Sequence, residues 1–427
     1  MTRKEKTKEI NMNHICKIEG HAHLSLKIEK NKVKSCELKA AEGARFFEAL
    51  VLNKKVEDVQ EIVSRICGIC SSAHTVAVIQ ALEKALGINP SEKQKIIREM
   101  LMIGERIRSH ATHLYFLALP DYYGFSSALD MAKSQPEKVQ NAVKIITLGN
   151  KIVENFGGRE IHPFLDIKQE NHNTKKDYQE IKKHIEETKP LIKETIELFL
   201  NIKYPTIERD TDYLSLQDKD YAVISGKIIS KSGKINVDDY KKHLTENIKE
   251  YATSKFALKD GQLFQVGALS RINNNYMHLD SETLHYLKNL DIPLKNPFYN
   301  NVAQALELLF VANRALLLID RIETLPEEKT EFKIKEGIGI SAVEAPRGTL
   351  FHEYKINKLG VITYCNIITP TVQNLNMMEF DIKNLVNKLL QEKSTKEQII
   401  QEIEKLIRAY DPCFSCSTHF LEVDWKE

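Results

Sequence analysis

Two pairs of cysteines near opposite ends of the chain set the strongest constraint on its fold. Cys67 and Cys70 form one CxxC motif, and Cys413 and Cys416 form the other, more than three hundred residues later. A CxxC segment turns tightly enough to present both sulfurs on one side, so two facing segments supply a tetrathiolate metal site. If both pairs serve one site, the fold must bring the two ends of the chain together.

The spacing alone leaves the bound species open among zinc, iron–sulfur and nickel. Zinc is slightly favoured by the spacing, although structural zinc sites usually close a much shorter loop. A thioredoxin-like redox function needs one CxxC that opens a helix after a strand, and the second motif would then have no role. A zinc site and a thiol-redox site therefore remain alternatives to a catalytic metal.

The composition is that of a globular protein in a reducing compartment. The 427 residues are 42% hydrophobic, and 61 basic residues nearly balance 59 acidic ones. This balance gives no net field that would attract nucleic acid or an anionic membrane. The charged N-terminus lacks the apolar core of a secretory signal, and no later stretch reaches about 18 uninterrupted apolar residues. We therefore expect a soluble, cytoplasmic protein without a transmembrane segment, whose clustered cysteines hold metal.

Apolar periodicity predicts an α+β fold that is predominantly helical, with a helical bundle core and a small N-terminal β element. Residues 23–29 and 33–38 have the pattern of a β-hairpin, and a strand pair is predicted within 221–237. Helices are predicted at 56–66, 73–86, 94–119, 138–155, 175–200, 241–255, 301–325, 379–392 and 396–409. Pro120 is expected to end the third of these, and the helix at 241–255 is expected to be polar and solvated.

No repeat or linker divides the chain, so the simplest interpretation is one domain over 1–427. Within it we expect the β element at 1–50, a metal-carrying helical body at 51–419 and a short tail at 420–427.

Seven short blocks, in order along nearly the whole chain, resemble the catalytic large subunit of NiFe hydrogenases. They are IEGH at 18–21, RFFE at 45–48, RICGIC at 65–70, VGALSR at 266–271, EAPRG at 344–348, TPT at 369–371 and RAYDPCFSC at 408–416. A related subunit of respiratory complex I has generally lost the four cysteines. Their retention favours a hydrogenase over a non-catalytic structural subunit that keeps them for zinc. The resemblance implies that family's fold and the reversible oxidation of dihydrogen to protons and electrons.

By resemblance, the four cysteines hold nickel and iron. Cys67 and Cys413 would be terminal nickel ligands, while Cys70 and Cys416 would bridge nickel to an iron that carries carbonyl and cyanide ligands. Soft thiolates suit both metals. Glu19 resembles the carboxyl group that takes a proton from a terminal cysteine, here Cys413, after heterolytic cleavage of dihydrogen.

Other residues resemble the surroundings of the metal pair. Arg347, which follows Pro346 in a turn, resembles the arginine that lies over the metals, where its fork can polarise dihydrogen or donate to a cyanide. Thr371 would donate to the other cyanide. Asp411 would orient Arg347 or cap a loop. His74 resembles a histidine that donates a hydrogen bond to a cysteine sulfur.

Two residues near the ends of the chain resemble ligands of a second ion. Glu48 and His419 would bind a structural magnesium or iron ion that ties the C-terminal segment to the N-terminal half. Ser109 occupies a position where some relatives carry an aspartate. This difference favours the cytosolic bidirectional branch, which includes sulfhydrogenases and enzymes linked to NAD(P) or deazaflavin, over the membrane-bound uptake branch.

The chain has no route by which electrons could leave, because one site uses all four paired cysteines. The resemblance implies an iron–sulfur small subunit and further subunits that react with NAD(P), a deazaflavin or ferredoxin. It also implies nickel chaperones and a maturation peptidase that cuts the chain once nickel is loaded.

We predict that this peptidase cuts after His419 and releases residues 420–427. The intact mass of the purified holoprotein should therefore correspond to a chain that ends at His419. A holoprotein that carries nickel and still ends at Glu427 would contradict this prediction.

Overall fold

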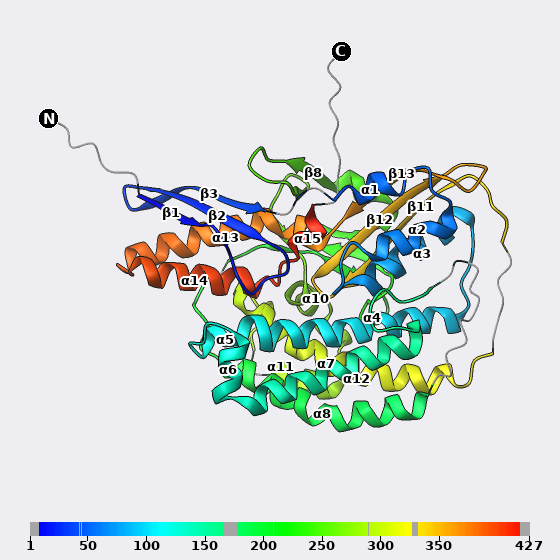
Figure 1. Cartoon of the computed structure of the whole chain (residues 1–427), viewed down its shortest axis with the longest axis horizontal. Helices are drawn as coiled ribbons and strands as arrows, with labels where there is room; N and C mark the ends of the chain where they lie inside the picture. Colours follow the sequence, from blue (N-terminus) through cyan, green and yellow to red (C-terminus); the bar gives the residue numbers. More distant parts are fainter. Residues whose placement is uncertain are drawn as a thin grey trace, which may run out of the picture.

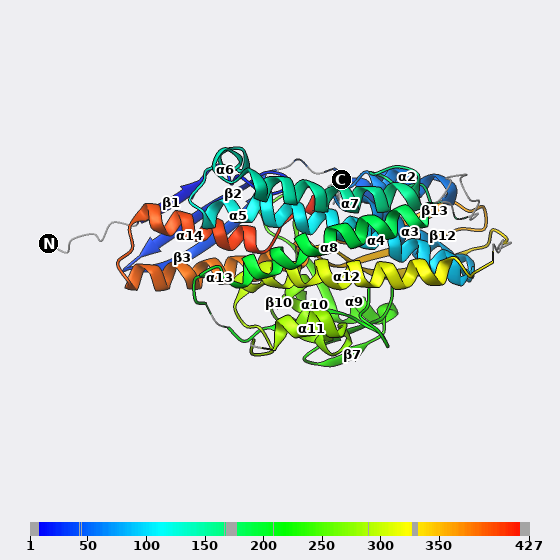
Figure 2. The ribbon, with the colours of Figure 1, turned by 90° about the horizontal axis from the view of Figure 1, so that it is seen from below.

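Four long helices pack side by side and form the main helical layer of the protein (Figures 1 and 2). The computed structural model describes residues 8–41, 43, 45–165, 167, 177–207, 209–288, 290–326 and 332–418. The four helices are α4 (Glu92–Thr112), α7 (Pro136–Gly157), α8 (Tyr178–Leu200) and α12 (Asn300–Ile322). Their apolar stripes form one buried cluster, so the predicted helices at 94–119, 138–155, 175–200 and 301–325 are confirmed.

The most apolar of these helices lies inside the protein. By length and hydropathy, the segment Pro297–Ile322 could cross a membrane, and it is the one helix of the described residues that meets this test. However, 78% of its most apolar window is buried against the rest of the chain. This burial is typical of the core helix of a folded domain.

The helix that carries the histidines continues past the predicted end. α4 is followed by a π-helical segment, η1 (His113–Ala118), and then by α5 (Leu119–Tyr122). Pro120 lies in the first turn of α5, where a missing backbone N–H leaves no helical hydrogen bond unmade. The prediction that Pro120 ends the helix was therefore wrong.

A helix and a strand with small side chains pack together and set the position of the first cysteine pair. α2 (Val56–Ser64) leads through the CxxC loop into α3 (Ser71–Leu86), as predicted. α3 lies against an antiparallel sheet of β11 (Gly337–Ala345), β12 (Gly348–Ile356) and β13 (Ile362–Ile368). Gly337 and Gly339 have no side chains to hold helix and strand apart, and Ser341 Oγ donates to the Ala77 carbonyl at 2.7 Å.

The N-terminal sheet covers two C-terminal helices (Figure 1). The predicted hairpin is confirmed as β2 (Ala22–Glu29) and β3 (Lys32–Ala40), and β1 (Lys8–Met12), which was not predicted, pairs with β2. The sheet shares a buried cluster with α13 (Pro370–Gln391) and α14 (Lys396–Ala409). α13 begins well before the predicted residue 379, so its first turn carries Thr371.

The middle of the chain forms short strands and helices on one side of the helical layer (Figure 2). They are β4 (Asp212–Tyr213), β5 (Ser215–Gln217), β6 (Lys227–Ser230), β7 (Gly233–Ile235), α9 (Tyr240–His243), β8 (Leu244–Ile248), β9 (Lys255–Lys259), β10 (Phe264–Gln265), α10 (Ala268–Asn275) and α11 (Ser281–Leu287). The strand pair within 221–237 is confirmed by β6 and β7. The helix at 241–255 was wrong, because α9 ends at His243 and β8 pairs with β9. This cross-strand pairing outweighs the helical propensity of a polar segment.

The remaining short elements are α1 (Phe47–Leu50), α6 (Ala128–Ser134), α15 (Phe414–Ser417) and the 3₁₀ turns η2 (Val237–Asp239), η3 (Tyr276–His278) and η4 (Pro297–Tyr299).

Replacing Gly339 by alanine should destabilise the protein. A Cβ at this position would lie 1.7 Å from the Ala81 carbonyl oxygen, so α3 and β11 would have to separate. We expect a loss of about 2–3 kcal/mol, typical of overpacking, measured as a lower urea midpoint. Ile338→Thr on the opposite, 56% exposed side of the strand is the control and should change the midpoint little. Equal midpoints for Gly339→Ala and wild type would refute the close packing.

Candidate metal centre

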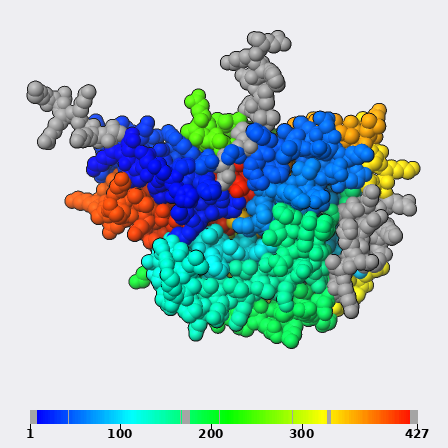
Figure 3. Space-filling model, viewed as in Figure 1, coloured from blue at the N-terminus to red at the C-terminus, as the bar shows by residue number. Residues whose placement is uncertain are grey.

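The four paired cysteines converge on one buried point. Cys67 and Cys70 lie in the loop between α2 and α3, whereas Cys413 and Cys416 lie at α15. Sulfur atoms of different pairs approach closely, with 3.6 Å between Cys67 and Cys413 and 3.4 Å between Cys70 and Cys416. All four sulfurs lie within 4.8 Å of one another, and all four residues are buried. Figure 3 shows the red C-terminal segment between blue N-terminal regions, so the two ends of the chain do meet.

The charges around the sulfurs fit a metal ion of high positive charge. Hydrogen bonding with the other cysteines, Cys413 first, holds the pKa of Cys67 well below its ordinary value. Burial raises the pKa values of Cys413 and Cys416 well above it. A metal cation bound at the site would stabilise the thiolate form of the buried cysteines. The donor set of four soft sulfurs therefore fits nickel and iron.

A buried arginine lies beside the sulfurs, at the turn between β11 and β12. Arg347 Nε donates to the Asp411 carbonyl at 2.8 Å and to Asp411 Oδ1 at 3.1 Å, and Nη2 lies 3.0 Å from Oδ1. Although burial opposes the charge, Asp411 and the cysteine sulfurs hold the pKa of Arg347 well above its ordinary value. Arg347 Nη1 is buried without a hydrogen-bond partner among the described residues. This free donor is available to a group bound at the four sulfurs.

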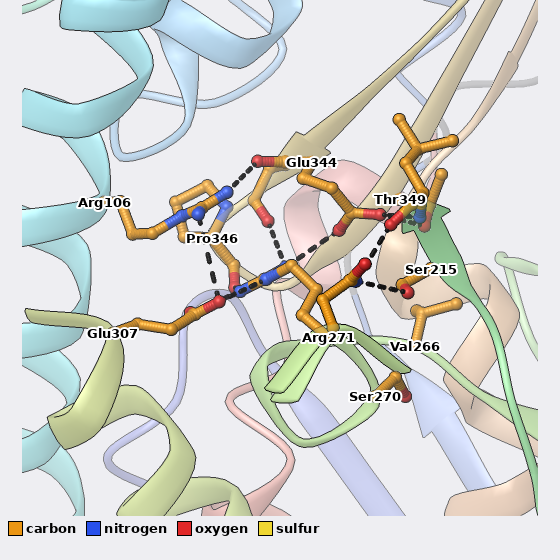
Figure 4. A network of polar contacts seen from close by, with 12 residues as sticks. Arg106, Ser215, Val266, Ser270, Arg271, Glu307, Glu344, Pro346 and Thr349 are labelled. Atoms are coloured by element: carbon orange, nitrogen blue, oxygen red, sulfur yellow. Dashed lines mark hydrogen bonds and ion pairs between the residues drawn. The ribbon is translucent and has the colours of Figure 1, made fainter. Parts of the chain in front are cut away.

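The backbone of the arginine turn is held by a second buried arginine (Figure 4). Arg271 donates from Nη1 to the Ala345 carbonyl at 2.9 Å and from Nη2 to the Pro346 carbonyl at 2.8 Å. Its charge is balanced by Glu307, at 2.6 and 2.7 Å, and by Glu344, at 3.0 Å. All five N–H groups of Arg271 therefore have acceptors, so the turn that carries Arg347 is fixed by fully paired charges.

The N-terminal segment supplies a carboxylate to the second cysteine pair. Cys413 Sγ donates to Glu19 Oε2 at 2.8 Å, and Ser415 Oγ donates to Glu19 Oε1 at 2.6 Å. Phe414 N donates to the Glu19 carbonyl at 3.0 Å, so the two segments are joined through the backbone as well. Gly20 allows this approach, because its φ is +79° and a Cβ there would lie 2.9 Å from Ser415 N.

Comparison with known proteins identifies the family to which this arrangement belongs. Residues 45–169 and 212–419 match the family described as nickel-dependent hydrogenase. The chain belongs to this family. It is 36% identical to the alpha subunit of sulfhydrogenase 1 of Pyrococcus furiosus, over 97% of this chain and 98% of that one.

Other comparisons agree with this assignment. The chain is 34% identical to the alpha subunit of sulfhydrogenase 2 of the same organism, over 97% of this chain and 100% of that one. Its fold is similar to a chain of a solved NAD+-reducing NiFe hydrogenase, with a TM-score of 0.86, 22% identity and coverage of 97% and 100%. The expected hydrogenase large-subunit fold is therefore confirmed, and the protein is the catalytic subunit of a hydrogenase rather than a zinc-binding structural protein.

The remaining predicted site residues of the hydrogenase lie at different depths. Thr371 is buried, and its Oγ1 accepts from Cys413 N at 2.8 Å. His74 is buried in α3, with Nδ1 3.1 Å from His352 Nε2. Glu48 is half-buried, and its Oε1 accepts from Ile367 N at 2.8 Å. Its proposed partner His419 lies outside the described residues.

Sequence reasoning assigned no role to several residues that hold the hydrogenase site in place. Ser415 lies inside the second CxxC, and Arg271 lies in the VGALSR block. Glu105 accepts from Ser72 N at 2.5 Å and Ala73 N at 3.1 Å, at the start of the helix that follows Cys70. Burial raises its pKa to about 7. A signal for Ser415 and Arg271 was present in the matching blocks, but Glu105 has none outside the tertiary structure.

Replacing Glu307 by glutamine should destabilise the hydrogenase strongly. Despite burial, Arg271 and Arg106 hold the pKa of Glu307 well below its ordinary value, so at neutral pH its charge balances two buried cations. Leaving these cations uncompensated should cost about 3–5 kcal/mol, measured by urea denaturation at pH 7. The loss should shrink as the pH falls from the unfolded-state glutamate pKa toward the lower folded-state value, because the wild-type contribution then disappears.

Glu92→Gln is the matched control for this substitution. The exposed Glu92–Arg321 pair has an N–O distance of 2.9 Å and should contribute less than about 1 kcal/mol. Similar midpoints for the two variants would contradict the role of Glu307 as a buried counter-charge.

Proposed function

We propose that the chain oxidises dihydrogen reversibly at a nickel–iron pair held by Cys67, Cys70, Cys413 and Cys416. The observation that carries this proposal is the convergence of four buried sulfurs within 4.8 Å. When bound, the metal pair supplies the Lewis acidity and redox capacity that split dihydrogen. In this proposal Cys67 and Cys413 are terminal nickel ligands, and Cys70 and Cys416 also bind the iron, which carries carbonyl and cyanide.

The proton leaves through Glu19 in this proposal. The Cys413 sulfur already donates to Glu19 Oε2 at 2.8 Å, which is within the reach required of a general base. Ser415 donates to the same carboxylate from its hydroxyl and, at 3.2 Å, from its backbone N–H. These donors orient Glu19 and leave Oε2 directed at the sulfur that releases the proton.

Arg347 provides fixed positive charge near the sulfurs. Asp411 and the Pro346 turn hold its guanidinium, and the unpartnered Nη1 can polarise dihydrogen or donate to a cyanide ligand. Thr371 Oγ1 accepts from the Cys413 amide, so its own hydroxyl proton remains available for the second cyanide. His74 tunes a cysteine sulfur by a hydrogen bond in this scheme.

The proposal includes a second metal site, which holds a structural ion. Glu48 and His419 bind magnesium or iron and thereby tie the C-terminal segment to the N-terminal half. In this proposal residues 1–427 form one domain, because the metal ligands come from both ends of the chain.

The chain passes its electrons to an iron–sulfur small subunit. Two relatives are named as alpha subunits, which fits a chain that works in a complex. Further subunits reactive with NAD(P), a deazaflavin or ferredoxin complete the path. Assembly in the cytoplasm requires nickel chaperones and the maturation peptidase.

Metal analysis and infrared spectroscopy test the proposal. The large subunit of the purified complex should contain nickel and iron, and its infrared spectrum should show the stretching bands of carbonyl and cyanide. Cys67→Ser should lose nickel, while Cys36→Ser, a substitution outside the site, should keep it. Zinc alone in the wild-type protein would overturn the proposal in favour of a structural site.

Glu19→Gln should separate metal binding from proton transfer. Glutamine keeps the size and the acceptor oxygen but cannot take up a proton, so nickel and iron should remain. Hydrogen–deuterium exchange catalysed by the enzyme should fall on the order of 10²–10⁴-fold. Glu37→Gln in β3 serves as the surface control. Wild-type exchange in Glu19→Gln would show that protons leave by another route.

A further inference from the structure

A buried hydrogen-bond chain leads from Arg347 away from the sulfurs to His113. Arg347 pairs with Asp411, and Asp411 Oδ2 accepts from Gln304 Nε2 at 3.0 Å. Gln304 Oε1 lies 2.5 Å from His113 Nδ1, and His113 Nε2 lies 2.6 Å from the Arg408 carbonyl oxygen. Both Gln304 and His113 are only 1% exposed. The orientation of Arg347 thus depends on side chains from α12 and η1.

The chemistry of the acceptors fixes the donor and the acceptor of every hydrogen bond between Arg347 and His113. The Asp411 carboxylate, paired with Arg347, can only accept, so the Gln304 amide must present its nitrogen to Asp411 and its oxygen to His113. The Arg408 carbonyl can also only accept. Both ring nitrogens of His113 therefore face acceptors, and only an imidazolium donates to both.

The two acceptors of His113 belong to different parts of the fold. Arg408 lies in the last turn of α14, at the negative end of the helix dipole, and its carbonyl also accepts from Asp411 N at 2.8 Å. The Asp411 carboxylate lies on the far side of Gln304. His113 also begins the π-helical segment η1, and such segments occur frequently at functional sites.

The histidine one turn earlier has the opposite environment. His110 Nε2 lies 2.7 Å from Glu307, but its Nδ1 is buried without a partner among the described residues. Burial lowers the pKa of His110 to about 4. His110 thus faces one acceptor, whereas His113 faces two. His113 is the histidine that is linked to Arg347 through Gln304 and Asp411.

We propose that His113 is a positioning residue that, as a double donor, fixes Gln304 and through it holds Asp411 and Arg347 at the four cysteines. The inference rests on the proposed function, in which Arg347 acts on the bound dihydrogen. Without a donor at Nδ1, the Gln304 amide can rotate and turn its oxygen toward Asp411. The carboxylate then moves away and takes the Arg347 guanidinium with it.

Two substitutions at His113 separate this role from a merely structural one. The amide nitrogen of asparagine stands near the position of Nδ1, and that of glutamine stands near the position of Nε2. His113→Asn therefore keeps the donor to Gln304 and loses the bond to Arg408, whereas His113→Gln does the reverse. If His113 only tied η1 to α14, His113→Gln would be the better tolerated variant.

The experiment compares both variants in the assembled hydrogenase, in the wild-type and Arg347→Lys backgrounds. Nickel and iron content, kcat and KM for dihydrogen and the cyanide stretching bands are measured for each. Gln304→Met, which has no donor for Asp411, is a second variant in case His113→Gln fails to assemble.

We expect nickel and iron to be retained in all of these proteins. His113→Gln and Gln304→Met should lower kcat by about 10–100-fold and shift the cyanide bands, because a catalytic group is displaced. His113→Asn should retain most of the activity and the wild-type bands. In the Arg347→Lys background, His113→Gln should cause no further loss of kcat.

The opposite results would overturn the inference. These are equal activity of His113→Gln and His113→Asn, unchanged cyanide bands with Gln304→Met, or a further loss from His113→Gln in the Arg347→Lys background. A wild-type protein without nickel, or an Arg347→Lys variant as active as wild type, would instead remove the proposed function and this inference with it.

Discussion

The structure depends on the meeting of four sulfur atoms from opposite ends of the chain in one buried volume. The second cysteine pair is held there by contacts with distant segments, since Cys413 N donates to Thr371 of α13 and Phe414 N donates to Glu19 of the N-terminal segment. Arg45 N donates to the Thr418 carbonyl and adds a further backbone contact between the two halves. The metal ligands therefore come together only when the N-terminal sheet, α3 and α13 are all in place.

Burying charged groups around the four sulfurs costs free energy, and this cost determines which partners those groups need. Charged groups removed from water must be paired and fully hydrogen-bonded. Arg271 meets this condition with two carboxylates and two carbonyls, and Arg347 meets it in part with Asp411. Asp411 itself has a positive φ of 49°, an uncommon backbone conformation that allows both its carbonyl and its carboxylate to face Arg347. Nη1 of Arg347 has no hydrogen-bond partner among the described residues, and its guanidinium lies near the cysteine sulfurs.

Much of the candidate site could be predicted because its residues lie in short blocks with distinctive chemistry. The two CxxC pairs, Glu19 and the Pro346–Arg347 turn each carry a local signal. Gln304 and Glu105 carry none, because an isolated glutamine or glutamate in a helical pattern indicates an exposed surface position. Their roles depend on which helix faces α4 or α3, and no local pattern encodes that choice. The prediction of a helix at 241–255 was wrong for the same reason, since β8 forms only through its pairing with β9.

The four paired cysteines, the family resemblance and most of the helices could be predicted from the sequence alone, because these depend on residue type and on spacing along the chain. The packing of the whole chain was needed to show which cysteine lies beside which, that Glu19 accepts from Cys413, and that Gln304 and Asp411 link His113 to Arg347. The physical reason is that hydrogen bonds and burial depend on distances between segments remote in sequence, and those distances are set by the packing of helices and sheets as whole bodies.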